Sequence, residues 1–189
     1  FEIKDGSLSI NSKSSGFVSI VHDPWRPVPS DGGHLGQNPG LFDRGKIDNR
    51  LDIAVFQTHY LKENIHLSGI PTLHTAVTTD QESFDICAAL SLINEEDETI
   101  NQFTTGFLRI KKAIKDIEKN YIIRLHPTNL SITKGSKLRL SLSASAWPAI
   151  GVNPGDSKFR CGNTSIDHKI TTLNFNLKKS IMKINPFFK

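Results

Sequence analysis

The chain has 189 residues, of which 37% are hydrophobic and 22% charged, so it is long enough to bury a core and too apolar to be disordered. Lys and Arg exceed Asp and Glu by 23 − 19 = 4, but the basic residues are scattered, which excludes a nucleic-acid-binding stripe. No apolar run approaches the ~20 residues that cross a bilayer. We therefore predict a single domain over residues 1–189, with neither nucleic acid nor membrane as a partner.

The first residues of the chain and its two cysteines indicate whether it is part of a longer polypeptide and in which cellular compartment it lies. The sequence begins at Phe1 rather than Met, without a basic and then apolar secretory signal. We interpret it as a fragment of a longer polypeptide. Cys87 and Cys161 are far apart and form neither a disulfide framework nor a CxxC motif. Two reduced thiols favour an intracellular, cytoplasmic location.

Period-two alternation of apolar and polar residues recurs along the chain, whereas helical periodicity is nearly absent. Turn residues separate the alternating segments at short spacing. In chain order, the predicted strands are residues 17–21, 51–58, 64–68, 72–79, 84–93, 99–110, 120–126, 138–145 and 169–177. Short strands in this number predict an all-β protein built as a sandwich or jelly roll.

Two of the predicted strands differ in how we expect them to be covered. In residues 138–145, leucine or alanine alternates with arginine or serine, which predicts one buried face and one solvent face. In residues 84–93 the second face is also partly apolar, because it carries Cys87 and Ala89. We expect that strand to be central in its sheet and covered on both faces.

Proline and glycine concentrate in residues 24–45 and 148–162. We predict long loops there, and long loops carry function more often than short turns do. Residues 111–119 (KKAIKDIEK) combine good helix formers with opposite charges, so a short surface helix is predicted in that segment. At most one or two short helices are expected in the whole fold.

The chain lacks the sequence marks of a complete hydrolase site. No GxSxG nucleophile elbow occurs, and none of the seven histidines stands in a recognisable triad context. His66 and His74 could face each other across neighbouring strands as metal ligands, but no HxH or HExxH spacing supports them. We therefore predict no catalytic residue, no metal site and no cofactor in this chain.

The strongest acidic cluster is residues 95–98 (EEDE), which could be taken for a calcium loop. It lacks the ligand spacing and the central glycine of an EF-hand. Because the cluster lies between two predicted strands, we expect an exposed hairpin turn whose charge keeps the sheet edge soluble.

The proline-rich loop carries a dense pattern, because residues 22–33 read HDPWRPVPSDGG. This pattern resembles the DPxxPVPxxGG signature of the C-terminal domain of the X-Pro dipeptidyl-peptidase and cocaine-esterase-like (CocE/NonD) serine hydrolases. Further segments resemble the family in the same order and extend the similarity over nearly all of residues 6–160. They are NPG with DR at 38–44, RLD at 50–52, IHLSGIP at 65–71, FDI at 84–86, TGFLR at 105–109, KGSKLRL at 134–140, SAWP at 145–148 and NP at 153–154.

The resemblance implies a jelly-roll-like β-sandwich of the galactose-binding-domain-like type. In the family, this is the non-catalytic C-terminal domain of a longer chain. The serine, aspartate and histidine lie in an N-terminal α/β-hydrolase domain of the same polypeptide. The resemblance therefore implies a domain that packs on a peptidase or esterase domain and shapes its substrate pocket without reacting itself.

The same resemblance places the segment after the double glycine at the border of the substrate pocket or in the interdomain seam. The candidates there are His34, Leu35, Gln37 and Asn38.

Four charged residues that follow have the chemistry of a charge-assisted cluster that would pin this loop to the sandwich. They are Asp43, Arg44, Arg50 and Asp52. Trp147 comes just after a predicted strand, so we expect it to cap the core rather than to lie on the catalytic domain.

Two other classes of function stay open at the level of sequence. Jelly rolls often bind sugars, so a carbohydrate- or ligand-binding module that uses Trp25 as a stacking surface is the alternative. A purely structural domain, which could form a homo-oligomer, is not separable from the first interpretation.

Overall fold

A computed structural model describes residues 2–4, 7–9, 16–33, 38–94, 96, 98–158, 160–163, 166–184 and 186–188. The described chain is built from fourteen β-strands and one four-residue helix. Along the chain the elements are β1 (Glu2–Lys4), β2 (Ser7–Ser9), β3 (Phe17–His22), β4 (Phe42–Asp43), α1 (Gly45–Asp48), β5 (Ala54–Gln57), β6 (Ile65–Gly69), β7 (Thr72–Thr79), β8 (Phe84–Ile93), β9 (Ile100–Ile110), β10 (Lys119–Arg124), β11 (Thr128–Ile132), β12 (Lys137–Ser143), β13 (Thr171–Lys183) and β14 (Pro186–Phe188).

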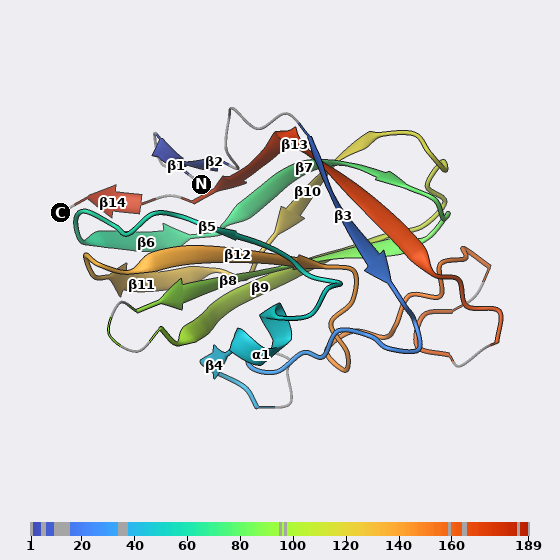
Figure 1. The fold of residues 1–189 in the computed structure, drawn as a ribbon, viewed down its shortest axis with the longest axis horizontal. Helices are drawn as coiled ribbons and strands as arrows, with labels where there is room; N and C mark the ends of the chain where they lie inside the picture. The colour runs from blue at the N-terminus through green and yellow to red at the C-terminus, as the bar shows by residue number, and fades with distance from the viewer. Residues whose placement is uncertain are drawn as a thin grey trace.

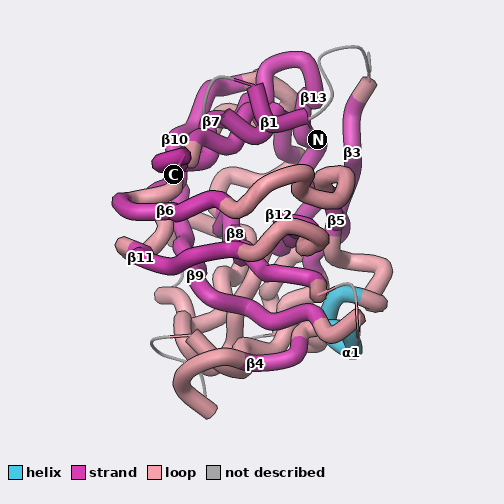
Figure 2. The backbone as a smooth tube through the Cα atoms, turned by 90° about the vertical axis from the view of Figure 1, so that its left-hand side faces the viewer, coloured by secondary structure: helices cyan, strands magenta, loops and turns pink. Residues whose placement is uncertain are grey.

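The strands form two main layers, and the strand pairs within them are antiparallel. One layer is the sheet β1-β2-β13-β7-β10, with β3 also paired to β13, and the other is the sheet β4-β9-β8-β12-β5. A small sheet, β11-β6-β14, lies beside them at the end where both termini are found (Figure 1). Figure 2 shows β13 and β7 on one side of the molecule and β8, β9 and β12 on the other. The predicted all-β sandwich is confirmed.

The hydrophobic core lies between the two layers. Leucine, isoleucine and phenylalanine side chains from both sheets are buried there, with Leu73 and Phe175 from one layer and Leu90 and Leu140 from the other. Phe84 meets the ring of Tyr121 edge-on, with ring centroids 5.7 Å apart. The side chains at every second position of β7, β8, β12 and β13 supply this core, as the alternation in the sequence predicts.

Each of the nine predicted strands corresponds to a strand in the structure. The expectation that the strand at 84–93 is covered on both faces is also confirmed, since nine of its ten residues are buried. The predicted strand at 169–177 begins at Thr171 and continues to Lys183 through an irregularity after Asn176. Among the additional strands, β11 begins just after Pro127, beyond the end of β10 at Arg124, and it was not predicted.

The helix predicted at residues 111–119 is wrong. These residues form a connection whose backbone bonds to the β7–β8 turn, with Ala113 N donating to Glu82 O (2.7 Å) and Asp116 N to Thr79 O (2.8 Å). Lys112 and Asp116 have positive φ angles of 60° and 59°, which an α-helix excludes. Contacts with a neighbouring turn therefore outweigh the local helix propensity. The helix that does form, α1, is a single turn that was not predicted.

The acidic run at residues 95–98 connects β8 to β9. Ile93 pairs with Ile100 across the antiparallel ladder, so the predicted hairpin is confirmed, although Glu95 and Asp97 lie outside the described residues. In the part of the chain that the structure describes, no helix has the length and apolarity needed to cross a membrane.

Candidate functional site

The five-stranded sheet has a second face that is polar and nevertheless buried. Ser141 and Ser143 of β12, together with Ser145 just after it, are at most 5% exposed. The alternation in residues 138–145 predicts that these serines face solvent, and this prediction is wrong. Two long loops cover them: the arm, which comprises residues 23–33 and 38–53, and the second loop, which comprises residues 144–158, 160–163 and 166–170. We call the covered surface the polar face.

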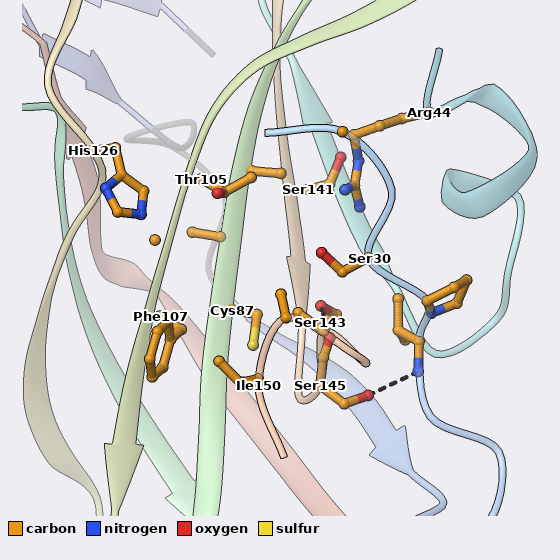
Figure 3. A pocket seen from close by; sticks show the side chains of 18 residues that line it. Ser30, Arg44, Cys87, Thr105, Phe107, His126, Ser141, Ser143, Ser145 and Ile150 are labelled. Carbon is orange, nitrogen blue, oxygen red and sulfur yellow. Dashed lines mark hydrogen bonds between the residues drawn. The ribbon is translucent and has the colours of Figure 1, made fainter. Parts of the chain in front are cut away.

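The arm is bonded to the second loop through the residues that alternate with its prolines. Ser30 N donates to Trp147 O (2.7 Å), Trp147 N donates to Val28 O (2.9 Å), and Val28 N donates to the buried hydroxyl of Ser145 (2.8 Å, dashed in Figure 3). Pro27 and Pro29 have no N–H, so the donors available in this stretch are those of residues 28 and 30, and both are used. The proline spacing therefore matches the spacing of the backbone hydrogen bonds.

Trp147 does not cap the core. Its side chain is 49% exposed, while its backbone forms the bridge to the arm. The expected core position is wrong, because the backbone of Trp147 is held by the arm while the residue itself stays half exposed.

Gly32 lets the arm turn where no side chain fits. Its φ is +70°, and a Cβ atom at this position would lie 2.3 Å from Cβ of Phe42. Gly33 and Gly40 then exchange two backbone hydrogen bonds, of 2.8 and 3.1 Å. These bonds close the segment that holds the predicted pocket residues. Asn38 is exposed and donates from Nδ2 to Asp31 Oδ1 at 3.4 Å. His34, Leu35 and Gln37 lie outside the described residues, so their role stays a prediction.

The four charged residues of the arm form separate contacts rather than one cluster. Arg44 is buried and donates from Nε to Asp48 (3.1 Å) and from Nη1 to Gln102 on β9. Oδ1 of Asp43 accepts from the backbone N–H groups of residues 45 and 100, at 2.9 and 3.3 Å. Arg44 and Asp43 thus attach the start of α1 to β9.

Arg50 and Asp52 pair with each other in a two-pronged contact of 2.8 and 2.7 Å. Arg50 Nη2 also donates to Arg26 O (2.8 Å), which fastens the end of the arm to its beginning. The hydrogen bonds to Asp52 raise the pKa of Arg50.

A further buried cluster fastens the second loop, and the sequence analysis assigned no role to its members. Asp85 of β8 accepts from Arg109 Nε (2.9 Å) and Nη2 (2.7 Å), and from Asn153 Nδ2 (2.9 Å). Arg109 also donates to Gly151 O. The available signal was Asp85 inside a mostly apolar strand, because a buried carboxylate requires partners. The partners come from 24 and 68 residues away.

The chemistry that this face can perform is limited. Its cavity has a volume of about 50 Å³, which holds a few water molecules and is far below the ~300 Å³ of a small-molecule site. Cys87 lies in it (Figure 3), and burial raises the pKa of its thiol, so the thiol stays protonated and unreactive. Among the described residues, no group of three His, Cys, Asp or Glu side chains is placed to hold a metal ion.

A serine–histidine contact does occur among the described hydrogen bonds, but outside the polar face. His66 Nδ1 and Ser131 Oγ are 3.0 Å apart, as cross-strand partners on the exposed surface of β6 and β11. Neither residue sits on a strand-to-helix turn of the kind that activates a nucleophile. The serine–histidine contact thus has a different setting from a nucleophile elbow, whereas the described contacts of the polar face hold the two loops on the sheet.

His22, just before the arm, leads to a prediction about how the free energy of unfolding depends on pH. It is 3% exposed, its Nε2 has no hydrogen-bond partner, and burial lowers the pKa of its imidazole from 6.5. The unfolded chain therefore binds a proton more readily, and the free energy of unfolding should fall as the pH drops below about 6.5. Urea titrations between pH 7 and 5 are expected to show this fall, with a shallower slope for His22→Gln.

An exposed imidazole provides the control for this measurement. His59→Gln should keep the wild-type slope, because His59 is exposed. Burial also lowers the pKa of His74, so part of the slope should persist in His22→Gln. Equal slopes for His22→Gln and the wild type would contradict the assignment.

Comparison with known proteins gives one family and a set of similar folds. Residues 3–180 match the family described as the X-Pro dipeptidyl-peptidase C-terminal non-catalytic domain. No curated protein matches the chain by sequence.

Three solved structures are similar in fold. They are an aminopeptidase from a marine-sediment Thaumarchaeota archaeon (15% identity, TM-score 0.84), an α-amino acid ester hydrolase (17%, 0.80) and a CocE/NonD family hydrolase from Staphylococcus aureus (14%, 0.57). The similarity covers 96%, 93% and 94% of this chain, but only 36%, 33% and 35% of those chains. This chain therefore spans about a third of the length of the proteins it resembles.

Proposed function

This chain belongs to the family of X-Pro dipeptidyl-peptidase C-terminal non-catalytic domains, and from that premise we propose that it packs on a catalytic α/β-hydrolase domain of the same polypeptide and shapes that domain's substrate pocket. The whole protein would be a serine hydrolase with peptidase or esterase activity. The length of the similar hydrolases supports this proposal, because about two thirds of each lies outside the similarity.

The observation that carries the proposal is a set of apolar side chains exposed on loops that are firmly held. Trp25 is 56% exposed, Leu51 is fully exposed and Trp147 is half exposed. The hydrogen bonds of Ser30, Val28 and Arg50 described above hold the segments that carry them. Apolar side chains presented on an ordered surface are typical of an interface rather than of a mobile loop.

The surface beside Leu51 is hollowed and carries charged side chains. A hollow of about 400 Å³ is lined by residues of β3 and of both ends of the arm, namely Val21, Asp23, Arg26, Asn49, Arg50, Leu51 and Asp52. Apolar side chains surrounded by charged ones form the usual pattern of a polar-rimmed protein interface. We propose that the catalytic domain covers Trp25, Leu51 and this hollow.

The proposal predicts that the double substitution Trp25→Ala and Leu51→Asp separates the two domains in the full-length protein. A tryptophan at an interface hot spot costs about 2 kcal/mol or more when it is truncated, so the loss of Trp25 alone should shift the interdomain equilibrium at least ~30-fold. Limited proteolysis should then release the sandwich, and the KM for substrate should rise. Ile70→Asp serves as the control, because Ile70 is similarly exposed but lies at the β6–β7 turn.

The isolated chain tests the non-catalytic role. Residues 1–189 alone are expected to hydrolyse neither X-Pro dipeptide amides, α-amino acid esters nor simple acyl esters, whereas the full-length protein should hydrolyse at least one of these classes. Hydrolysis by the chain alone would contradict the proposal. Sugar binding that is lost in Trp25→Ala would instead favour the carbohydrate-binding alternative. A cytoplasmic location and a homo-oligomer stay predictions.

A further inference from the structure

The carboxylates in the hollow beside Leu51 are already engaged by the arm itself. Both carboxylate oxygens of Asp52 accept from Arg50, at 2.8 and 2.7 Å. Asp23 Oδ1 accepts from Trp25 N at 3.0 Å. Of the two carboxylates that line the hollow, one is therefore fully paired and the other is held in a turn.

Arg26, which lines the same hollow, differs from its charged neighbours. Its backbone is fixed, because its N donates to Asp23 O (3.0 Å) and its O accepts from Arg50 Nη2 (2.8 Å). Its side chain is exposed, and none of the ion pairs among the described residues includes its guanidinium. Arg26 thus presents a positive charge and its N–H donors from a firmly held stretch of the arm.

Covering this hollow removes water from the Arg26 guanidinium, and this step rests on the function proposed above. A charge taken out of water needs a partner that accepts its hydrogen bonds. Asp52 cannot be that partner without releasing Arg50, and the ion pairs of the described residues do not join Asp23 to Arg26. The acceptor therefore has to come from the covering domain.

We propose that an aspartate or glutamate side chain of the catalytic domain enters the hollow and pairs with Arg26. A carboxylate matches the planar guanidinium with two parallel hydrogen bonds and supplies the opposite charge. A hydroxyl or a backbone carbonyl would accept a hydrogen bond but leave the charge without compensation. The hollow of about 400 Å³ has room for such a side chain.

Carbodiimide cross-linking of the full-length Arg26→Lys variant tests the proposal directly. The reagent activates a carboxylate, the introduced amine attacks it, and an amide bond forms while one carboxylate oxygen leaves with the reagent as a urea. We expect mass spectrometry to find this amide between position 26 and one Asp or Glu of the catalytic domain. Arg124→Lys places the same amine on exposed β10 and should give no amide to that carboxylate. Absence of an amide from position 26 to the catalytic domain would overturn the proposal.

Charge reversal gives a second readout, the interdomain equilibrium measured by limited proteolysis. Arg26→Gln should shift this equilibrium toward separated domains at least ~30-fold, as expected when one partner of a buried charge pair is removed. Arg26→Glu should shift it further, because it opposes two like charges. Replacing the cross-linked carboxylate with arginine should restore domain contact in Arg26→Glu but not in Arg26→Gln. Equal effects of the two substitutions, or no rescue, would refute the carboxylate.

The two proposals fail separately. If Trp25→Ala with Leu51→Asp separates the domains while neither Arg26→Gln nor Arg26→Glu does, the catalytic domain covers this surface without a carboxylate at Arg26. If none of these variants separates the domains, the proposed contact itself is refuted.

Discussion

A Gly106→Ala substitution is expected to destabilise the protein by roughly 3 kcal/mol, the upper end of the cost of overpacking. Gly106 lies in β9, where the end of β10 crosses it. A Cβ atom added there would lie 2.4 Å from Arg124 O and 2.7 Å from Leu125 Cα. Both are backbone atoms, so no side chain can rotate away to make room.

The backbone at this crossing is held in place on both sides of the glycine. His126 N donates to Thr105 O, and Thr104 Oγ1 donates to His126 O, each at 2.8 Å. Making space for a methyl group therefore means breaking or stretching these hydrogen bonds. Urea unfolding should show a lower midpoint with an unchanged m-value.

A second glycine serves as the matched control for Gly106. Gly45→Ala adds the same methyl group in α1, where the contacts within 4 Å are side-chain atoms at 3.2 to 3.8 Å. Its effect should be within about 0.5 kcal/mol. Similar destabilisation by both substitutions would contradict the argument from the strand crossing.

The second large effect is expected for Asp85→Ala, at roughly 3 kcal/mol. Asp85 is 1% exposed and accepts three hydrogen bonds, two from Arg109 and one from Asn153. Removing the carboxylate leaves a guanidinium and an amide without their acceptor. The cost should lie at the lower end of the range for a broken buried ion pair, because the Arg109 side chain is 26% exposed and water can reach its charge.

The same substitution should also loosen the second loop. Asn153 Oδ1 accepts from Gly155 N (3.1 Å), and Arg109 donates to Gly151 O, so the loop at 151–155 is ordered through Asp85. Hydrogen exchange is expected to accelerate in this loop before it does in β8. Glu118→Gln, at an exposed pair with Lys179, should leave the unfolding midpoint near that of the wild type, since exposed ion pairs are screened. Unaltered exchange in Asp85→Ala would contradict the pinning role.

The sequence alone was sufficient for the fold class and for most of the strands. The reason is that the alternation of Leu138, Leu140 and Leu142, or of the residues in β7, is a local property: each strand shows which side it buries, whatever its neighbour is. The segments that resemble the hydrolase family are likewise short and contiguous, so the resemblance is visible in the sequence alone. The strand at residues 84–93 was correctly expected to be covered on both faces for the same local reason.

Other features depended on contacts between distant residues. The serines at 141, 143 and 145 alternate like solvent-facing residues, and only the arm and the second loop bury them. Asp85 accepts a hydrogen bond from Asn153, which is 68 residues away in the sequence. Neither segment contains a pattern that predicts this pairing. The segment at 111–119 has helix formers but bonds to the β7–β8 turn instead. In each case the observed conformation is stabilised by contacts with residues distant in sequence, which a local pattern does not contain. Propensity and periodicity thus determined the strands, while tertiary packing determined which polar residues were buried and which loops were held.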